Sequence, residues 1–225
     1  MQLQQLSKAI ESMKTSGEKR NFLQSVDLTV NFQGIDFSKP TTRLDLEIAL
    51  PAGRGKQTKI CVIAGDELVV EAKKVADRVV SKEEIVQLGG DQAALKRLAD
   101  EHAFFLCQIE LMPLVGKHLG QVLGPRGKLP KPVPGNSKLG PAIERLKKTV
   151  RVKTKGKFLP TVHCAIGTEE MPVEDLSKNA EAVLNSIVEK LPNKEGSLKS
   201  VFVKTTMGTP VKIQIRETRE VAVAK

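Results

Sequence analysis

Hydrophobic and polar residues follow different patterns in different parts of the chain. Near the start, apolar residues recur every three or four positions from Leu3 to Met13, which predicts an amphipathic helix. Apolar and polar residues then alternate over 26–33 and again over 44–50. Such alternation predicts strands that bury one face and expose a polar one.

The middle of the chain changes pattern after a glycine-rich, basic stretch at 51–59. Apolar runs and helical patterns alternate there, in the order 60–64 (apolar), 66–77 (helical), 78–80 (apolar), 91–101 (helical), 103–107 (apolar) and 140–148 (helical). Short buried strands that alternate with helices predict a parallel, Rossmann-like sheet.

The first pattern returns after Val150. Alternation at 162–166, 201–203 and 211–215 predicts strands, and an amphipathic helix lies between Pro172 and Pro192. Because both ends of the chain share one pattern, we predict an α/β protein of two domains. A discontinuous α+β domain would combine 1–57 with 150–225, and a Rossmann-like domain, 58–149, would be inserted through a double-stranded hinge.

The composition is that of a chain with a buried core in a reducing compartment. Of its 225 residues 40% are hydrophobic, and the three cysteines are too few and too scattered for a disulfide scaffold. No stretch approaches the roughly 18 apolar residues of a membrane span, and the first residues do not form a signal peptide. We therefore expect a cytoplasmic protein without membrane contact.

The positive charge is concentrated in one segment. The chain carries a formal charge of +10, and 112–160 holds twelve basic residues against one acid, Glu144. A localised excess of this kind indicates a polyanionic partner, although an ordinary charge run is more often a solvated surface. This segment also contains seven glycines and seven prolines, which favours binding because glycine lets backbone N–H groups approach phosphates. The chain has no Trp or Tyr and only seven Phe. Nucleic acid would therefore be bound by means other than an aromatic stacking platform.

Two basic, glycine-containing stretches resemble phosphate-binding loops but lack the required spacing. The segments 53–58 and 124–128 have no glycine five residues before the final one and no Ser or Thr after the lysine. We interpret them as basic loops that face RNA or the cleft between the two domains. The three histidines lack metal-ligand spacing, and Glu169-Glu170 is better explained by a helix N-terminus than by catalysis. Neither a metal nor a cofactor is expected.

The segment 200–210 ends a predicted strand at Thr205-Thr206-Met207-Gly208. Hydroxyl groups can bond ribose and phosphate oxygens, glycine permits close backbone approach, and methionine offers a flexible apolar contact. A plain strand-ending turn explains the same residues equally well. Physical reasoning alone leaves these two interpretations open.

Five segments, in the same order, resemble the ribosomal protein L-one family in its archaeal form. They are 51–56 (PAGRGK), 111–117 (LMPLVGK), 119–128 (LGQVLGPRGK), 162–167 (VHCAIG) and 200–210 (SVFVKTTMGTP). The resemblance implies a hinged protein with an inserted Rossmann-like domain. It also implies a monomer when free and, in the cell, a ribosome-associated structural constituent of the large ribosomal subunit.

The family resemblance implies RNA partners as well. Its members bind a folded region of large-subunit rRNA, form the mobile lateral stalk beside the tRNA exit site and assist release of deacylated tRNA. Many also bind their own mRNA and repress its translation.

The resemblance places the RNA contacts in three groups of residues. The principal surface is Ser200, Thr205, Thr206, Met207 and Gly208, a second patch is Asn31, Phe32 and Gln33, and secondary contacts to RNA or tRNA are Arg54, Lys56, Arg126 and Lys128. Which of the three residues in the second patch meets RNA is left open. We expect charge in the inserted domain to attract RNA, while the nearly neutral principal surface recognises its shape.

Two alternatives compete with this interpretation. A nucleotide-dependent enzyme would need a glycine-rich turn after the first inserted strand, whereas Ile63-Ala-Gly-Asp-Glu67 has one glycine followed by two acids. A free RNA chaperone or a separate translational repressor could share the same fold. The sequence does not distinguish this last alternative from a ribosomal subunit protein.

Overall fold

The computed structural model describes residues 3–17, 20–37, 39, 42–134, 139–154, 159–192 and 194–214. The chain separates into two compact units, which we call the terminal unit (1–56 with 148–225) and the inserted unit (57–147). The domain boundaries expected from the sequence, 57/58 and 149/150, lie within two residues of the boundaries between these units.

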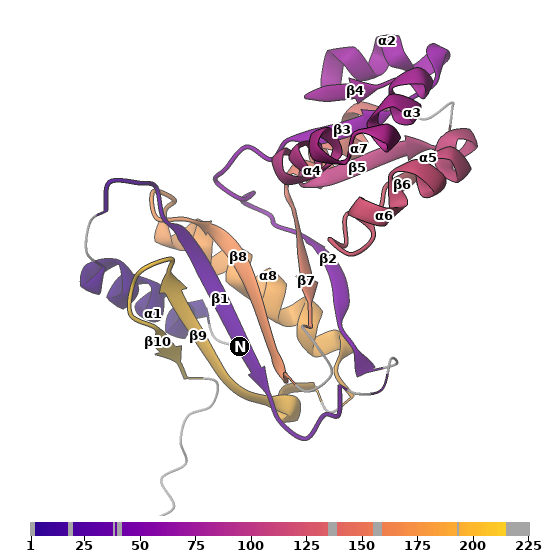
Figure 1. The fold of residues 1–225 in the computed structure, drawn as a ribbon. Helices are drawn as coiled ribbons and strands as arrows, with labels where there is room; N and C mark the ends of the chain where they lie inside the picture. Colours follow the sequence, from indigo (N-terminus) through magenta and orange to yellow (C-terminus); the bar gives the residue numbers. More distant parts are fainter. Residues whose placement is uncertain are drawn as a thin grey trace, which may run out of the picture. The chain divides into compact units, whose positions relative to one another are not determined.

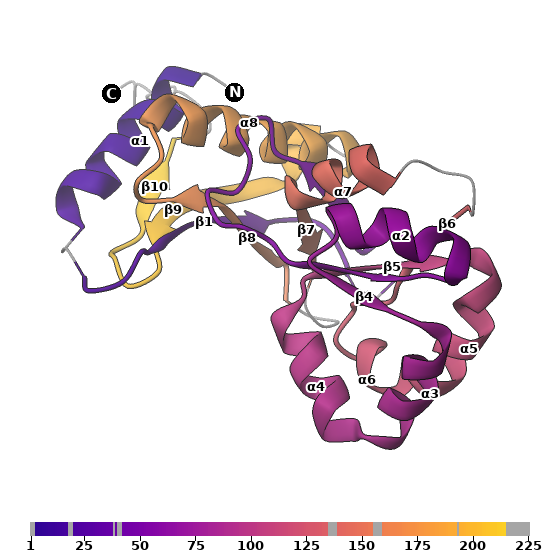
Figure 2. The same cartoon turned by 90° about the horizontal axis from the view of Figure 1, so that it is seen from above.

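An antiparallel sheet in the order β10-β9-β1-β8 forms the centre of the terminal unit. Its strands are β1 (Ser25–Phe32), β8 (Thr161–Thr168), β9 (Leu198–Thr205) and β10 (Val211–Ile213). Two helices, α1 (Leu3–Ser16) and α8 (Val173–Lys190), lie side by side on one face of this sheet (Figures 1 and 2). A two-stranded antiparallel ribbon of β2 (Asp45–Ala49) and β7 (Thr149–Lys153) completes the unit.

The predicted alternation along β1 is confirmed. Val26, Leu28 and Val30 are fully buried beneath the two helices, whereas the residues between them are only partly buried. In α1 the buried positions Leu6 and Ile10 face the same core, as the helical spacing predicts. The sheet therefore has one apolar face under helices and one polar face.

A buried asparagine fixes the chain where it approaches the inserted unit. Asn179 of α8 is fully buried, and its side-chain oxygen accepts a hydrogen bond from the amide of Ala52 at 3.0 Å. Its side-chain nitrogen donates to the carbonyl oxygens of Gly53 and Ile166, each at 2.8 Å. Because all three partners are backbone groups, this side chain holds the 52–53 loop against β8 and α8.

The inserted unit is built on a parallel sheet in the order β4-β3-β5-β6. The strands are β3 (Ile60–Ile63), β4 (Arg78–Val80), β5 (Phe104–Gln108) and β6 (Lys131–Val133). In the described part of this unit the accompanying helices are α2 (Asp66–Val75), α3 (Lys82–Gly90), α4 (Gln92–Glu101), α5 (Met112–His118), α6 (Gly120–Leu123) and α7 (Leu139–Lys147). Short 3₁₀ turns occupy Ile109–Leu111 here and Lys194–Ser197 in the terminal unit. The predicted α/β class and Rossmann-like sheet are confirmed.

Some elements were not predicted from the pattern. The sequence predicts no helix over α3, and none over 112–123, where the structure has α5 and α6. Gly116 and Gly120 sit in these helices with open space where a side chain would be, so neither glycine there serves a tight turn. Ile215, predicted as part of the last strand, lies outside the described residues. Among the helices that the structure describes, none has the length and apolar character to cross a membrane.

Candidate nucleic-acid interface

The face of the terminal sheet opposite α1 and α8 carries polar side chains from all four strands. Residues paired directly across antiparallel strands point to the same side of a sheet. Thr29 of β1 pairs with Phe202 of β9 and with His163 of β8, and Phe202 also pairs with Lys212 of β10. These four residues form a row across the sheet. Adjacent rows add Asn31 with Ser200 and Asp27 with Lys204; we call all eight residues the open face.

The structure brings two of the predicted patches together on this face. The side-chain nitrogen of Asn31 donates to Oγ of Ser200 at 2.9 Å, although the two residues are 169 positions apart. Gln33 is exposed just beyond β1, and its Nε2 donates to the carbonyl oxygen of Gly196 at 3.2 Å. The Thr206–Gly208 turn follows the other end of β9. The open face thus connects the second patch to the principal surface.

Three predicted contact residues are buried. Ser200 is 9% exposed but lies on the open face, whereas Phe32 and Thr205 have their side chains inside the protein. Phe32 is 2% exposed and its ring centroid lies 5.5 Å from that of Phe37. Thr205 is 3% exposed, and its hydroxyl has no hydrogen-bond partner among the described residues. Both occupy positions of a strand whose side chains point into the core. Of the three residues in the second patch, Asn31 and Gln33 present their side chains at the surface and Phe32 does not.

The turn after β9 is anchored through its backbone. The amide of Thr206 donates to the carbonyl oxygen of Ser25 at 3.0 Å, and that of Gly208 donates to the carbonyl oxygen of Thr205 at 3.2 Å. The amide of Met207 donates to Oε1 of Gln24 at 3.1 Å. All three amides are used inside the protein. The turn therefore offers a ligand its side chains, above all Met207, which is 63% exposed.

The positively charged side chain of Lys56 lies beside this turn. Nζ of Lys56 donates to Oγ of Ser25 at 3.1 Å, and the backbone nitrogen of Ser25 donates to Oγ1 of Thr206 at 3.1 Å. The predicted secondary residue Lys56 thus belongs to the principal surface. Burial raises the pKa of the nearby Asp27 carboxyl, against the opposing effect of Lys204, His163 and Lys56. Arg54 is half-buried, which lowers the pKa of its guanidinium.

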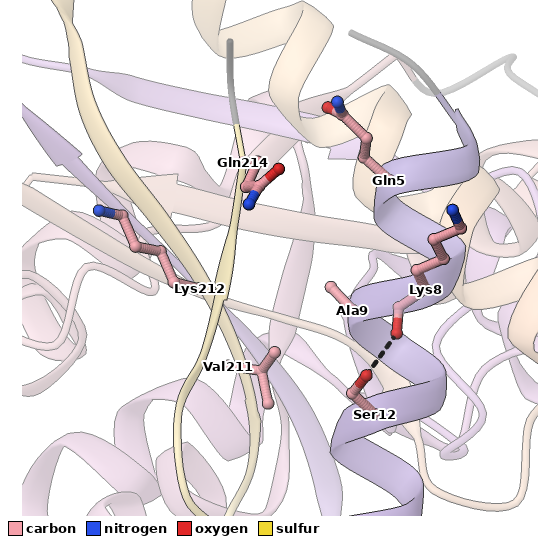
Figure 3. A pocket seen from close by; sticks show the side chains of 7 residues that line it. All are labelled: Gln5, Lys8, Ala9, Ser12, Val211, Lys212 and Gln214. Atoms are coloured by element: carbon pink, nitrogen blue, oxygen red, sulfur yellow. Dashed lines mark hydrogen bonds between the residues drawn. The ribbon is translucent and has the colours of Figure 1, made fainter. Parts of the chain in front are cut away.

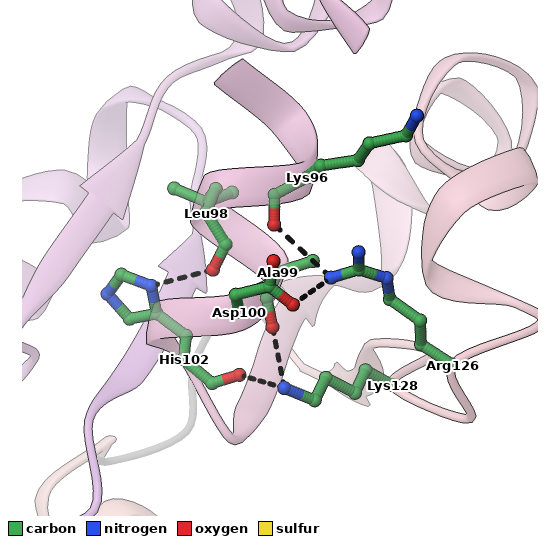
Figure 4. A network of polar contacts seen from close by, with 7 residues as sticks. All are labelled: Lys96, Leu98, Ala99, Asp100, His102, Arg126 and Lys128. Carbon is green, nitrogen blue, oxygen red and sulfur yellow. Dashed lines mark hydrogen bonds and ion pairs between the residues drawn. The ribbon is translucent and has the colours of Figure 1, made fainter. Parts of the chain in front are cut away.

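Arg126 and Lys128 have partners within the inserted unit (Figure 4). Arg126 donates to the carboxylate of Asp100 and to the carbonyl oxygen of Lys96, the latter at 3.2 Å. Nζ of Lys128 donates to the carbonyl oxygens of Ala99 and His102 at 2.5 and 2.9 Å. Burial lowers the pKa of Lys128, although the charge of Asp100 raises it in part. Both cations contact groups near the C-terminus of α4, where positive charge stabilises the negative end of the helix dipole. Arg126 and Lys128 therefore have a structural role.

The basic segment is divided between the two units. Its members up to Lys147 lie in the inserted unit, whereas Lys148, Arg151 and Lys153 lie in the terminal unit. Arg151 is paired there with Asp45, since its Nε and Nη2 donate to the two carboxylate oxygens at 2.7 and 2.6 Å. The inserted unit therefore carries only part of the charge excess of this segment, and β7 carries another part.

Among the described residues of the inserted unit, the loop that follows β3 is not arranged as a nucleotide-binding turn. The amide of Gly65, at the start of α2, already donates to Oε1 of Gln108 at 2.9 Å. A dinucleotide-binding turn would use such amides for the pyrophosphate. In the described part of the chain, no three His, Cys, Asp or Glu side chains come together as metal ligands would.

The described surface of the terminal unit includes a groove and a smaller hollow. A groove of about 260 Å³ between α1 and β10 is lined by Lys8, Ser12, Val211 and Lys212, among others (Figure 3). A smaller hollow of about 170 Å³ lies beside the turn and is lined by Met207, Gly208, Thr209, Ser16 and Arg20. The smaller hollow gives the principal surface a recess next to its most exposed side chain.

Gln24, Ser25, Phe202 and Lys204 were not among the predicted site residues. Gln24 and Ser25 are distant in sequence from the turn that they hold, so no local motif marks them. Phe202 and Lys204 alternate with Val201 and Val203 within β9. That alternation could have indicated that they share the face of Ser200.

Comparison with known proteins identifies the class to which this two-unit fold belongs. Residues 12–209 match the model of the ribosomal protein L1p/L10e family, and the chain belongs to that family, in its archaeal form. Large ribosomal subunit protein uL1 of Methanococcus vannielii is 47% identical over 209 residues, covering 93% of this chain and 97% of the relative.

Two further archaeal relatives show a similar degree of identity. The protein of the same name from Methanothermobacter thermautotrophicus is 44% identical over 93% of this chain and 99% of its own length. The protein from Thermococcus kodakarensis is 45% identical over 94% and 97% respectively. The similarity therefore extends over both units.

Proposed function

We propose that this chain is a structural, non-enzymatic protein of the large ribosomal subunit that binds rRNA through the open face and the Thr206–Met207–Gly208 turn. Family membership and the names of the archaeal relatives support the ribosomal role. The observation that carries the RNA-binding site is the exposed turn, anchored through its backbone at the end of a polar sheet face.

The chemistry of this surface fits folded RNA. The Thr206 hydroxyl accepts from the amide of Ser25 and donates to its carbonyl oxygen, which leaves it able to accept a hydrogen bond from a ribose hydroxyl. Asn31, held by the buried Ser200, can use its remaining amide hydrogen on a ribose or phosphate oxygen. Met207 offers its exposed thioether to a sugar or base face. Lys56 and Lys204 lie nearby, where positive charge favours the phosphate backbone. In this proposal the terminal unit is the rRNA-binding domain.

The remaining parts of the proposal follow from the family. The bound protein forms the lateral stalk beside the tRNA exit site and assists the release of deacylated tRNA. The inserted unit, which carries Arg126 and Lys128, makes the secondary contacts to rRNA or tRNA. The same open face binds the protein's own mRNA and represses its translation, because one surface can serve two RNAs of similar shape. The protein is cytoplasmic, ribosome-associated and monomeric when free.

A titration with the isolated rRNA stalk fragment tests the binding site. At moderate salt with competitor tRNA, Thr206→Ala should weaken binding by about 1–3 kcal/mol. The reason is that the RNA group bonded to the Thr206 hydroxyl loses its hydrogen-bond partner and stays buried in the interface. Thr15→Ala removes an exposed threonine hydroxyl from α1, on the helical side of the sheet, and should leave affinity unchanged. Equal affinities of wild type and Thr206→Ala would contradict the proposed site.

Sedimentation distinguishes a subunit protein from a free RNA chaperone or repressor. In a sucrose gradient of cell extract, the protein should migrate with large subunits in near-stoichiometric amount. A protein found only in the free fraction would favour the chaperone or repressor. If the mRNA proposal holds, the stalk fragment should compete with the leader of the protein's own mRNA for binding, and Thr206→Ala should weaken both.

A further inference from the structure

A buried glutamine connects the RNA-binding turn to a carboxylate on another segment. Gln24 is 2% exposed. Its Oε1 accepts the amide hydrogen of Met207 at 3.1 Å, and its Nε2 donates to Oε2 of Glu169 at 3.1 Å. The turn, the start of β1 and the end of β8 are joined through this one side chain.

Backbone groups hold the same pair in register. Oε1 of Glu169 accepts from the backbone nitrogen of Gln24 at 3.3 Å, and the backbone nitrogen of Glu169 donates to the carbonyl oxygen of Gln24 at 3.1 Å. The orientation of the Gln24 amide follows from its neighbours. The Met207 amide can only donate, and a carboxylate can only accept, so the oxygen must face Met207 and the nitrogen must face Glu169.

We propose that Gln24 and Glu169 are positioning residues for RNA recognition, which fix the backbone of Met207 and so the direction of its exposed side chain. The inference rests on the proposed function, since it concerns the same turn. A turn that is already ordered when RNA arrives loses less conformational entropy on binding. An amide that bridges a donor and an acceptor can supply that order, whereas neither a carboxylate nor an alanine at position 24 can do both.

An exchange of the two side chains tests this arrangement. Gln24→Glu alone sets two carboxylates against each other, and we expect about tenfold weaker binding of the rRNA stalk fragment. Combined with Glu169→Gln, the carboxylate at position 24 can accept from both the Met207 amide and the new side-chain amide. The double variant should then bind within about twofold of wild type, with an unchanged salt slope.

Two measurements separate positioning from a general loss of structure. Hydrogen exchange of the Met207 amide should be slow in wild type and in the double variant, and fast in Gln24→Ala. Gln4→Glu adds the same charge on an exposed position of α1 and should change neither affinity nor exchange. Thermal unfolding of every variant verifies that the terminal unit is folded at the temperature of the titration.

The outcomes distinguish this inference from the proposed function. If Thr206→Ala and Met207→Ala bind like wild type, the proposed RNA site itself is wrong. If both weaken binding while Gln24→Glu binds like wild type, or the double variant binds no better than Gln24→Glu, the positioning role is wrong and the site stands. A rapidly exchanging Met207 amide in the wild-type protein would overturn the positioning role even if a variant failed to fold.

Discussion

Gly208 folds back onto Thr205 so closely that a Cβ atom at position 208 would overlap the Thr205 hydroxyl oxygen. The amide of Gly208 also donates to the Thr205 carbonyl oxygen at 3.2 Å. The Thr205 side chain is buried and β-branched, so it cannot readily turn away. The glycine is therefore required by the packing of the turn itself, before any ligand is considered.

Gly208→Ala should displace the turn and weaken binding of the stalk fragment about tenfold or more, because overpacking moves the backbone that carries Met207. Thr205→Ala removes the overlapping hydroxyl, so the double variant should recover much of the lost affinity. Titrations of both variants measure this. A double variant as weak as Gly208→Ala would show that RNA approaches the Gly208 backbone directly.

The salt dependence of binding should separate the two kinds of contact. Thr206→Ala should lower affinity without changing the slope of log affinity against log salt. Arg126→Ala should reduce that slope by about 0.7 to 1, because one phosphate contact is lost. Titrations at several salt concentrations measure both slopes. An unchanged slope for Arg126→Ala, together with a lower melting temperature, would show that Arg126 stabilises α4 and does not contact RNA.

Acid should weaken the ribbon formed by β2 and β7. The hydrogen bonds from Arg151, and then its charge, hold the pKa of Asp45 below its usual value of 3.8, although partial burial opposes this. A carboxyl with a lowered pKa stabilises the fold above that usual value and loses this contribution as pH falls through the lowered pKa. The pair is partly exposed, so solvent screening limits its contribution to about 0.5 kcal/mol.

Urea unfolding of wild type and Asp45→Asn measures this effect. The variant should be less stable at neutral pH, and the difference should shrink as the pH falls below the usual value of 3.8 and the Asp45 carboxyl becomes protonated. Glu11→Gln, on the exposed side of α1, serves as a control for the loss of an acid. A stability difference that persisted at the acid end would assign the effect to packing instead of charge.

The three cysteines should be unreactive in the folded protein. Burial raises the pKa of Cys61 and Cys164 to about 12 and that of Cys107 to about 11. Thiol reagents attack the thiolate, which is scarce at such values near neutral pH. Labelling followed by peptide mass spectrometry should find the three thiols slow in native protein and fast in denaturant. Rapid native labelling of one would reveal local opening of its unit.

The sequence pattern predicted much of the fold because the residues that form the buried face of one helix or strand recur at regular intervals along the sequence. Alternation marked β1, β8 and β9, and helical spacing marked α1 and α8. It predicted no element over α5 and α6, which contain glycines. A helix can contain a glycine when burial of its apolar side chains compensates for the low helix propensity of glycine. In α5 and α6 these buried side chains are Val115 and Leu123.

For the candidate site, the chain by itself determined which local segments carry RNA-binding chemistry, including Thr206 and Met207, since a strand and its turn are local. Only the tertiary structure decided which side chains are available. It turned Phe32 and Thr205 inward and placed Lys56 beside Thr206. It also revealed Gln24 as the partner of Met207 across 183 positions. The physical reason is that strand pairing is non-local: hydrogen bonds between strands, and not spacing along the chain, set which residues share a face.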